Sequence, residues 1–66
     1  MTVKNRLKEI LDERGTKNVW LAEKANVNNS TLGNIIKNRH NPSIEVAIKI
    51  ARALGMKVED IWIVED

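Results

Sequence analysis

Two short amphipathic segments meet across Asn26-Val27-Asn28, and this junction most constrains how the chain can fold. Each segment has apolar residues at the spacing of one helical face: Leu21, Ala22 and Ala25 on the first, and Leu32, Ile35 and Ile36 on the second. A junction of this length is too short for a flexible linker. The rest of the chain is therefore expected to hold this pair of helices in place.

The outer side of the second segment is unusual for a surface helix. It carries small, amide-bearing or singly charged residues: Asn29, Ser30, Gly33, Asn34 and Lys37. A helix that only needs to be soluble usually carries Glu and Lys on this side. The pattern indicates a surface that touches a polar partner at close range.

The totals exclude several classes of protein. Sixty-six residues form one domain, near the lower size limit for folding alone. No Cys is present and His40 is the one histidine, so we expect no disulfide, no metal and no cofactor. The same scarcity argues against an enzyme, since a domain this small has little room for a pocket. No membrane-spanning stretch and no signal peptide is recognised, and a cytoplasmic location is expected.

The charges are unevenly distributed. No acidic residue lies between Glu23 and Glu45, where Lys24, Lys37 and Arg39 contribute three positive charges. Residues 57–66 instead carry one Lys against four carboxylates, a balance of −3. A basic middle and an acidic end indicate a polyanionic partner at one face of the protein.

Capping residues and apolar spacing predict five helices. The first is capped by Thr2, buries Val3, Leu7, Ile10 and Leu11, and ends at Gly15; the second covers about residues 17–25 and ends at Asn26. The third begins at Asn28 or Asn29, ends at Lys37 and is followed by Asn38; the fourth runs from a Ser43 cap to Gly55, with Ala47, Ile50, Ala51 and Leu54 inside. Residues 58–61 form the short fifth helix.

The last apolar run, residues 61–64, has the composition of a β-strand. A strand needs a partner, and two candidates remain open. One is the start of the same chain, Met1-Thr2-Val3, and the other is a second copy of this strand.

In this order and spacing, the motifs resemble the Cro/CI-type (XRE) helix-turn-helix family of transcription regulators. The resemblance covers about residues 3–62 and rests on RLKEI…ERG, LAEK, V-x-x-S-T-L, N-P-S-I-E and A-I-K-I-A-R-A-L-G. It implies an all-α, compact five-helix lambda-repressor-like DNA-binding domain, with a short C-terminal β-strand added. Residues 1–66 would be a single domain, with the helix-turn-helix at about 17–37 and a dimerisation segment at about 56–66.

The chain departs from the family pattern at several positions. Asn26 and Asn38 stand where the family usually has Gly, and both can hold a left-handed backbone. Many members carry a buried Arg–Glu pair at the positions of Leu11 and Ile36. Because changing one member of such a pair is costly, the joint replacement predicts that these two side chains touch. Trp20 replaces a common Glu, and we have no physical account of that exchange.

The resemblance makes residues 28–37 a recognition helix for the major groove of double-stranded DNA. The expected base contacts are Asn28, Asn29, Ser30, Thr31, Gly33 and Asn34, and the expected phosphate contacts are Lys17, Asn18, Lys37, Arg39, His40 and Asn41. The competing interpretations are an uncharged helix surface for the first set and a solvated turn for the second. Asn41 can equally serve to bond the turn before Pro42.

The C-terminal run also has two interpretations. Ile61, Trp62, Ile63 and Val64 are expected to form a homodimer interface, because an exposed apolar strand favours pairing. Alternatively Trp62 closes the core of the monomer, and the two roles are compatible. A homodimer would bind a short palindrome with half-sites about 34 Å apart. With no sensing domain recognised in the sequence, repression by occupying a promoter is the expected mechanism.

A protein-interaction module is the competing function. Such a domain, for example an antitoxin that neutralises a toxin, would need an extra apolar patch on an outer helix. Val19, Trp20, Val46 and Ile48 are the candidates for that patch. A partner protein of this kind, either a toxin or an anti-repressor, therefore stays open beside double-stranded DNA.

Overall fold

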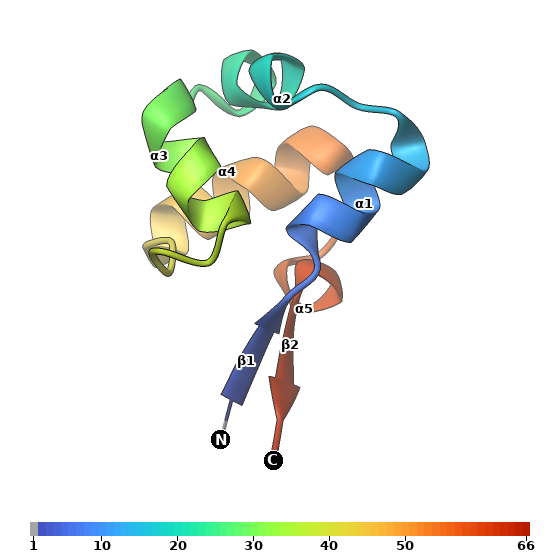
Figure 1. The fold of residues 1–66 in the computed structure, drawn as a ribbon, viewed down its shortest axis with the longest axis vertical. Coiled ribbons are helices and arrows are strands. Elements are labelled where there is room, and N and C mark those ends of the chain that lie inside the picture. Colours follow the sequence, from blue (N-terminus) through green and yellow to red (C-terminus); the bar gives the residue numbers. More distant parts are fainter. Residues whose placement is uncertain (1) are drawn as a thin grey trace.

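A computed structural model describes residues 2–66 and contains five helices and one two-stranded sheet. In chain order the elements are β1 (Thr2–Asn5), α1 (Leu7–Arg14), α2 (Asn18–Ala25), α3 (Asn29–Ile36), α4 (Ile44–Leu54), α5 (Val58–Ile61) and β2 (Trp62–Glu65). The helices form one body, and the two strands extend away from it along the long axis (Figure 1). The expected compact five-helix architecture with a short C-terminal β-strand is confirmed; the sheet adds a second strand, β1, to the all-α domain that was expected.

Most helix ends follow the predicted capping residues. The Asn28 side chain accepts a 2.8 Å hydrogen bond from the Ser30 backbone N–H, and the Ser43 hydroxyl accepts one from Val46. Both bonds satisfy N–H groups that have no partner within the helix. Left-handed backbone closes the other ends, at φ 57° for Asn26 and φ 62° for Asn38. The two asparagines therefore adopt the left-handed conformation that glycine usually adopts at these positions in the family that the sequence resembles.

The predicted start of the first helix is wrong. Thr2 does not cap a helix, and Val3 lies in β1 with 47% of its surface exposed. The helix begins only at Leu7; its N-cap residue Arg6 makes no side-chain capping bond, and the Asn5 side-chain oxygen instead accepts a 2.8 Å hydrogen bond from the Leu7 N–H. The remaining stripe of Leu7, Ile10 and Leu11 is buried as predicted.

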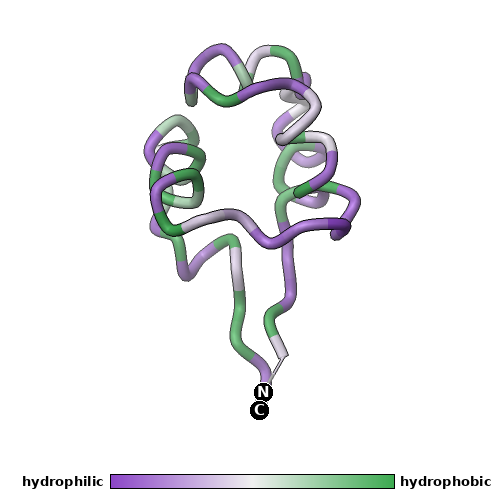
Figure 2. The backbone as a smooth tube through the Cα atoms, turned by 90° about the vertical axis from the view of Figure 1, so that its left-hand side faces the viewer, coloured by the Kyte–Doolittle hydropathy of each residue, from purple (hydrophilic) through white to green (hydrophobic). Residues whose placement is uncertain are grey.

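The partner of the C-terminal strand is the start of the same chain. β1 and β2 pair antiparallel, with Thr2 opposite Glu65 and Asn5 opposite Trp62. Of the three residues proposed as the partner strand, Met1 lies outside the described residues. Thr2 and Glu65 consequently lie side by side, and the two strands run together away from the helices (Figure 2).

One apolar core unites the helices. It contains fourteen buried side chains, drawn from every helix and from β2, and no buried polar or charged residue among residues 2–66. The predicted inner face of α4, namely Ala47, Ile50, Ala51 and Leu54, is buried. Leu11 is buried and Ile36 packs against the core, while direct contact between these two side chains stays a prediction.

The helices are also short. Hydrophilic and hydrophobic stretches alternate along them in Figure 2, as expected where only one side of each helix meets the core. No helix within residues 2–66 has the length and apolar character needed to cross a membrane.

Candidate nucleic-acid interface

The outer side of α3 forms a shallow polar hollow. Its volume is about 470 Å³, and it is lined by Asn29, Ser30, Gly33, Asn34 and Lys37. These are the five residues that the sequence placed on the outside of the helix, and the structure brings them together on one surface. The side of α3 that was expected to meet a polar partner therefore faces outward.

The chemistry of this hollow suits flat polar partners. The amide groups of Asn29 and Asn34 each offer both a donor and an acceptor, and Ser30 adds a hydroxyl that can do either. No carboxylate lines the surface, and Lys37 supplies one positive charge at its end. Amide side chains can bond adenine edges in pairs, so the surface has groups able to read bases.

Gly33 has no structural role that explains its presence. A Cβ placed on it would meet nothing within 4 Å, and its backbone φ lies outside the positive range that favours glycine. In the middle of a helix, Gly is about 1 kcal/mol less favourable than Ala. The space above Gly33 is therefore open to something outside the protein, at a cost to the helix itself.

Two of the predicted base contacts stand apart from the hollow. Asn28 uses its side-chain oxygen to cap α3, while its NH₂ group remains available to a ligand. Thr31 is exposed on the helix but does not line the hollow. Their contact with DNA stays a prediction.

The segment that begins with Lys37 carries four of the predicted phosphate contacts; Lys37 lines the hollow, whereas Asn41 lines a separate groove beside Trp62. The Arg39 N–H donates to the Asn34 backbone oxygen at 2.9 Å, and left-handed Asn38 turns the chain there. Lys37 directly follows α3, and Arg39, His40 and Asn41 continue the chain as exposed residues. Lys37 and Arg39 thus put two of the positive charges of the basic middle directly after α3, and their contact with phosphate stays a prediction.

The remaining predicted phosphate contacts lie at the start of α2. Lys17 is its N-cap and Asn18 its first residue, and both are exposed. No side chain caps this end, so its first backbone N–H groups are available to an anion. Asn18 opens the helix, which confirms a start within a residue of the predicted one.

A further residue was not predicted from the sequence. The Asn5 side chain donates a 2.7 Å hydrogen bond to the backbone oxygen of Ile35, in the last turn of α3, while its oxygen caps α1. It thus joins β1, α1 and α3. The one sign of this role in the sequence was an Asn two residues before the buried Leu7, since Asn side chains often bond the first N–H groups of a helix.

The C-terminal residues divide between core and surface. Ile61 is fully buried and Trp62 exposes 9% of its surface, so the prediction that Trp62 closes the monomer core is confirmed. Ile63 is half-buried and Val64 is exposed. Ile61 therefore has no surface to offer a second copy, while Ile63, Val64 and the edge of Trp62 do.

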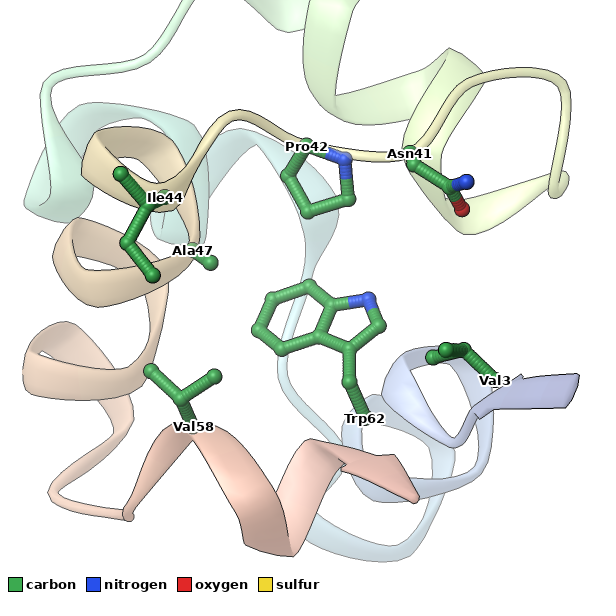
Figure 3. Close-up of a pocket in the computed structure, with 7 residues that line it drawn as sticks. All are labelled: Val3, Asn41, Pro42, Ile44, Ala47, Val58 and Trp62. Carbon is green, nitrogen blue, oxygen red and sulfur yellow. The ribbon is translucent and has the colours of Figure 1, made fainter. Parts of the chain in front are cut away.

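Beside Trp62 lies a second, mainly apolar groove of about 290 Å³. Figure 3 shows its lining: Val3, Asn41, Pro42, Ile44, Ala47, Val58 and Trp62. The indole ring fills its floor between the loop that follows α3 and the short helix α5. This groove adjoins the predicted dimerisation segment but includes residues from both halves of the chain.

The known proteins that this chain is similar to agree on one family. Residues 7–61 match the family model described as helix-turn-helix. The chain is 46% identical over 61 residues to an immunity repressor protein of Bacillus phage phi105, spanning 92% of this chain but 42% of the repressor. It is 39% identical over 64 residues to an uncharacterised HTH-type transcriptional regulator of Methanocaldococcus jannaschii, covering 97% of both chains. An HTH-type transcriptional regulator of Bacillus subtilis, YgzD, is 34% identical over 97% of both chains.

These matches cover all five helices, and they agree with the helix–turn–helix geometry of α2 and α3 and with the outward polar side of α3. The chain belongs to the helix-turn-helix family of the Cro/CI (XRE) type.

Proposed function

We propose that this protein is a sequence-specific, double-stranded DNA-binding transcriptional regulator, and specifically a repressor. The observation that carries the proposal is the outward polar hollow on α3, whose five lining residues include two amides, a hydroxyl and a lysine but no acid. The regulator names of the relatives, and the immunity repressor among them, support the same function.

In this mechanism α3 enters the major groove. Asn29 and Asn34 each bond an adenine edge, and Ser30 bonds a neighbouring base. The open space over Gly33 lets the helix backbone approach the base pairs closely. Asn28 offers a base the NH₂ group of its capping amide. Thr31 places its methyl group against the methyl group of a thymine.

Phosphate contacts fix the position of α3 in the groove. Lys17, Asn18 and the uncapped N–H groups at the start of α2 hold one part of the DNA backbone. Lys37, Arg39, His40 and Asn41 hold another part at the far end of α3. The phosphate contacts give affinity for DNA of any sequence, and the base contacts made by the hollow give sequence specificity.

The protein acts on DNA as a homodimer that binds a palindrome. A single module of this size buries too little DNA surface for high specificity, and two half-sites lie about 34 Å apart along the duplex. Each copy measures 33 × 21 × 19 Å, so two adjacent copies can span that separation. Occupying a promoter in this way blocks transcription.

Selection of bound sequences from a random DNA pool tests the proposal, with the oligomeric state measured in parallel. The expected result is an inverted repeat whose half-sites are centred about one helical turn apart. Failure to bind duplex DNA of any sequence at low ionic strength would overturn it. A single unrepeated site would refute the palindrome alone.

A second function is supported by one specific observation. Val19 and Trp20 are exposed on α2, and Trp20 lines a separate hollow of about 340 Å³ with Gly15, Thr16 and Lys17. Apolar surface of this kind suits a partner protein, such as a toxin or an anti-repressor. Replacing Trp20 by Ala would abolish such binding and leave DNA binding intact, whereas loss of DNA binding would argue against a separate partner site.

A further inference from the structure

The apolar groove beside Trp62 is bordered by large side chains that the fold leaves exposed. Ile44, at the start of α4, exposes 74% of its surface, and Val3 exposes 47%. Neither residue belongs to the core of the monomer. Apolar side chains gathered around a groove in this way mark a surface that another molecule covers.

The sheet extends this apolar surface. In an antiparallel pair, residues opposite each other point to the same face, and faces alternate along each strand. The register pairs Val3 with Val64 and Asn5 with Trp62, so Val3 and Val64 share the face of the sheet on which Trp62 lies. Val64 exposes 55% of its surface. A two-stranded ribbon with an uncovered apolar face is only marginally stable by itself.

The centre of the groove is Trp62, whose indole ring is packed into the fold. Its nitrogen Nε1 is inaccessible to solvent and has no hydrogen-bond partner within residues 2–66; it lies on the side of the ring nearest the loop at Asn41 and Pro42 (Figure 3). A second copy therefore meets the exposed apolar side chains at the rim of the groove and not this atom.

The charges near the groove suit a second copy of the same chain. Lys4 and Lys57 are the chain neighbours of Val3 and Val58, and Glu45 and Glu59 are the neighbours of Ile44 and Val58. All four charged residues are exposed. In a two-fold interface the same patch meets itself, so a patch with both signs can be complementary to its own copy.

We propose that this groove is the seat of the homodimer, a proposal that rests on the homodimer of the proposed function. Ile44 of each copy enters the groove of the other and covers the Val3–Val64 face. The dimer is thereby centred on α4, β1 and Trp62 rather than on pairing between two copies of β2.

Sedimentation of purified full-length variants over a range of protein concentrations tests this interface. Ile44→Asp puts a charge at its centre, and because Ile44 is outside the core the variant should fold normally. We expect its dimer dissociation constant to rise at least about 30-fold, the scale of an interface hot spot. Val19→Asp is the matched control, since Val19 is an exposed apolar residue on α2, and it should dimerise as the wild type does.

A single-tryptophan variant gives a second measurement. Trp20→Phe should leave dimerisation unchanged, and it leaves Trp62 as the single tryptophan. Because Trp62 lines the groove, its fluorescence should change with protein concentration as the dimer forms.

The outcomes separate this inference from the DNA-binding function. Ile44→Asp should bind an isolated half-site as the wild type does and lose its advantage on the palindrome. A folded Ile44→Asp that still dimerises, or a wild type that stays monomeric while bound to its palindrome, would overturn the groove as the interface. If Ile44→Asp dissociates as expected but neither it nor the wild type binds DNA, the interface stands and the DNA-binding proposal fails.

Discussion

The side-chain nitrogen of Asn5 lies 2.7 Å from the backbone oxygen of Ile35 and donates a hydrogen bond to it. The two residues are thirty positions apart, one in the first strand and the other in the last turn of α3. A helix end has backbone oxygens without partners inside the helix, and this bond satisfies one of them from outside. The strand pair that joins the chain ends therefore also holds the helix proposed to read DNA.

Asn5→Asp should separate the two bonds made by this residue. A carboxylate can still cap α1 through the Leu7 N–H, but it cannot donate to the Ile35 oxygen and repels it. We expect a loss of about 1–3 kcal/mol in the free energy of unfolding, together with weaker binding to the specific DNA site. Urea unfolding and DNA titration measure the two effects. Asn5→Ala is the control, because it removes both bonds. If only the bond to the Leu7 N–H mattered, Asn5→Asp would be clearly more stable than Asn5→Ala.

Gly33→Ala should change stability and DNA binding in opposite directions. The new methyl group meets nothing inside the protein, so the helix gains about 1 kcal/mol in the free energy of unfolding. The same methyl group projects into the hollow and should hinder the approach of base pairs, lowering affinity for the specific site. Thermal unfolding and DNA titration on the same sample test this. Unchanged or tighter DNA binding would remove Gly33 from the contact surface.

Asn34→Ala should relax the choice of base at one position in each half-site. Loss of a two-bond contact to a base is expected to cost about 1–3 kcal/mol on the specific sequence and little on non-specific DNA. Selection from a random pool, repeated with the variant, shows which position loses its preference. An equal loss on every sequence would mean that Asn34 does not read a base.

Lys37→Ala should weaken binding to all sequences alike. One lost phosphate contact reduces the slope of log K against log salt concentration by about one unit. Lys24→Ala is the matched control, because Lys24 is exposed on α2 but outside the predicted contact set. Titrations at several salt concentrations distinguish them. An unchanged slope in Lys37→Ala would exclude this lysine from the interface with DNA.

Local signals in the sequence predicted the helices well. The roles of Asn26, Asn38 and Ser43 depend only on nearby residues, so they can be predicted from the sequence alone. The two asparagines end helices through their own left-handed backbone, and Ser43 bonds Val46 three residues further on. The inner face of α4 follows in the same way from apolar spacing. The hollow on α3 was predicted because burying one side of a helix fixes which residues remain outside.

Long-range partners were harder to predict. Val3 fits the apolar stripe of the first helix by spacing, yet it lies in β1 opposite Val64. The sequence offered residues 1–3 both as a helix start and as a candidate partner strand, and only the position of β2 decides between them. The Asn5–Ile35 bond depends in the same way on how distant elements meet. The groove beside Trp62 is assembled from five separate segments, so spacing within any one segment could not reveal it.

The strand pair also determines the order in which the molecule is expected to assemble and open. Thr2 pairs with Glu65, so this contact closes nearly the whole chain into a loop. Closing a long loop costs more conformational entropy than forming a helical turn, and the ribbon has few buried side chains to offset that cost. Amide hydrogens of the ribbon should exchange with solvent well before those of α4, and a copy that has already docked would slow that exchange.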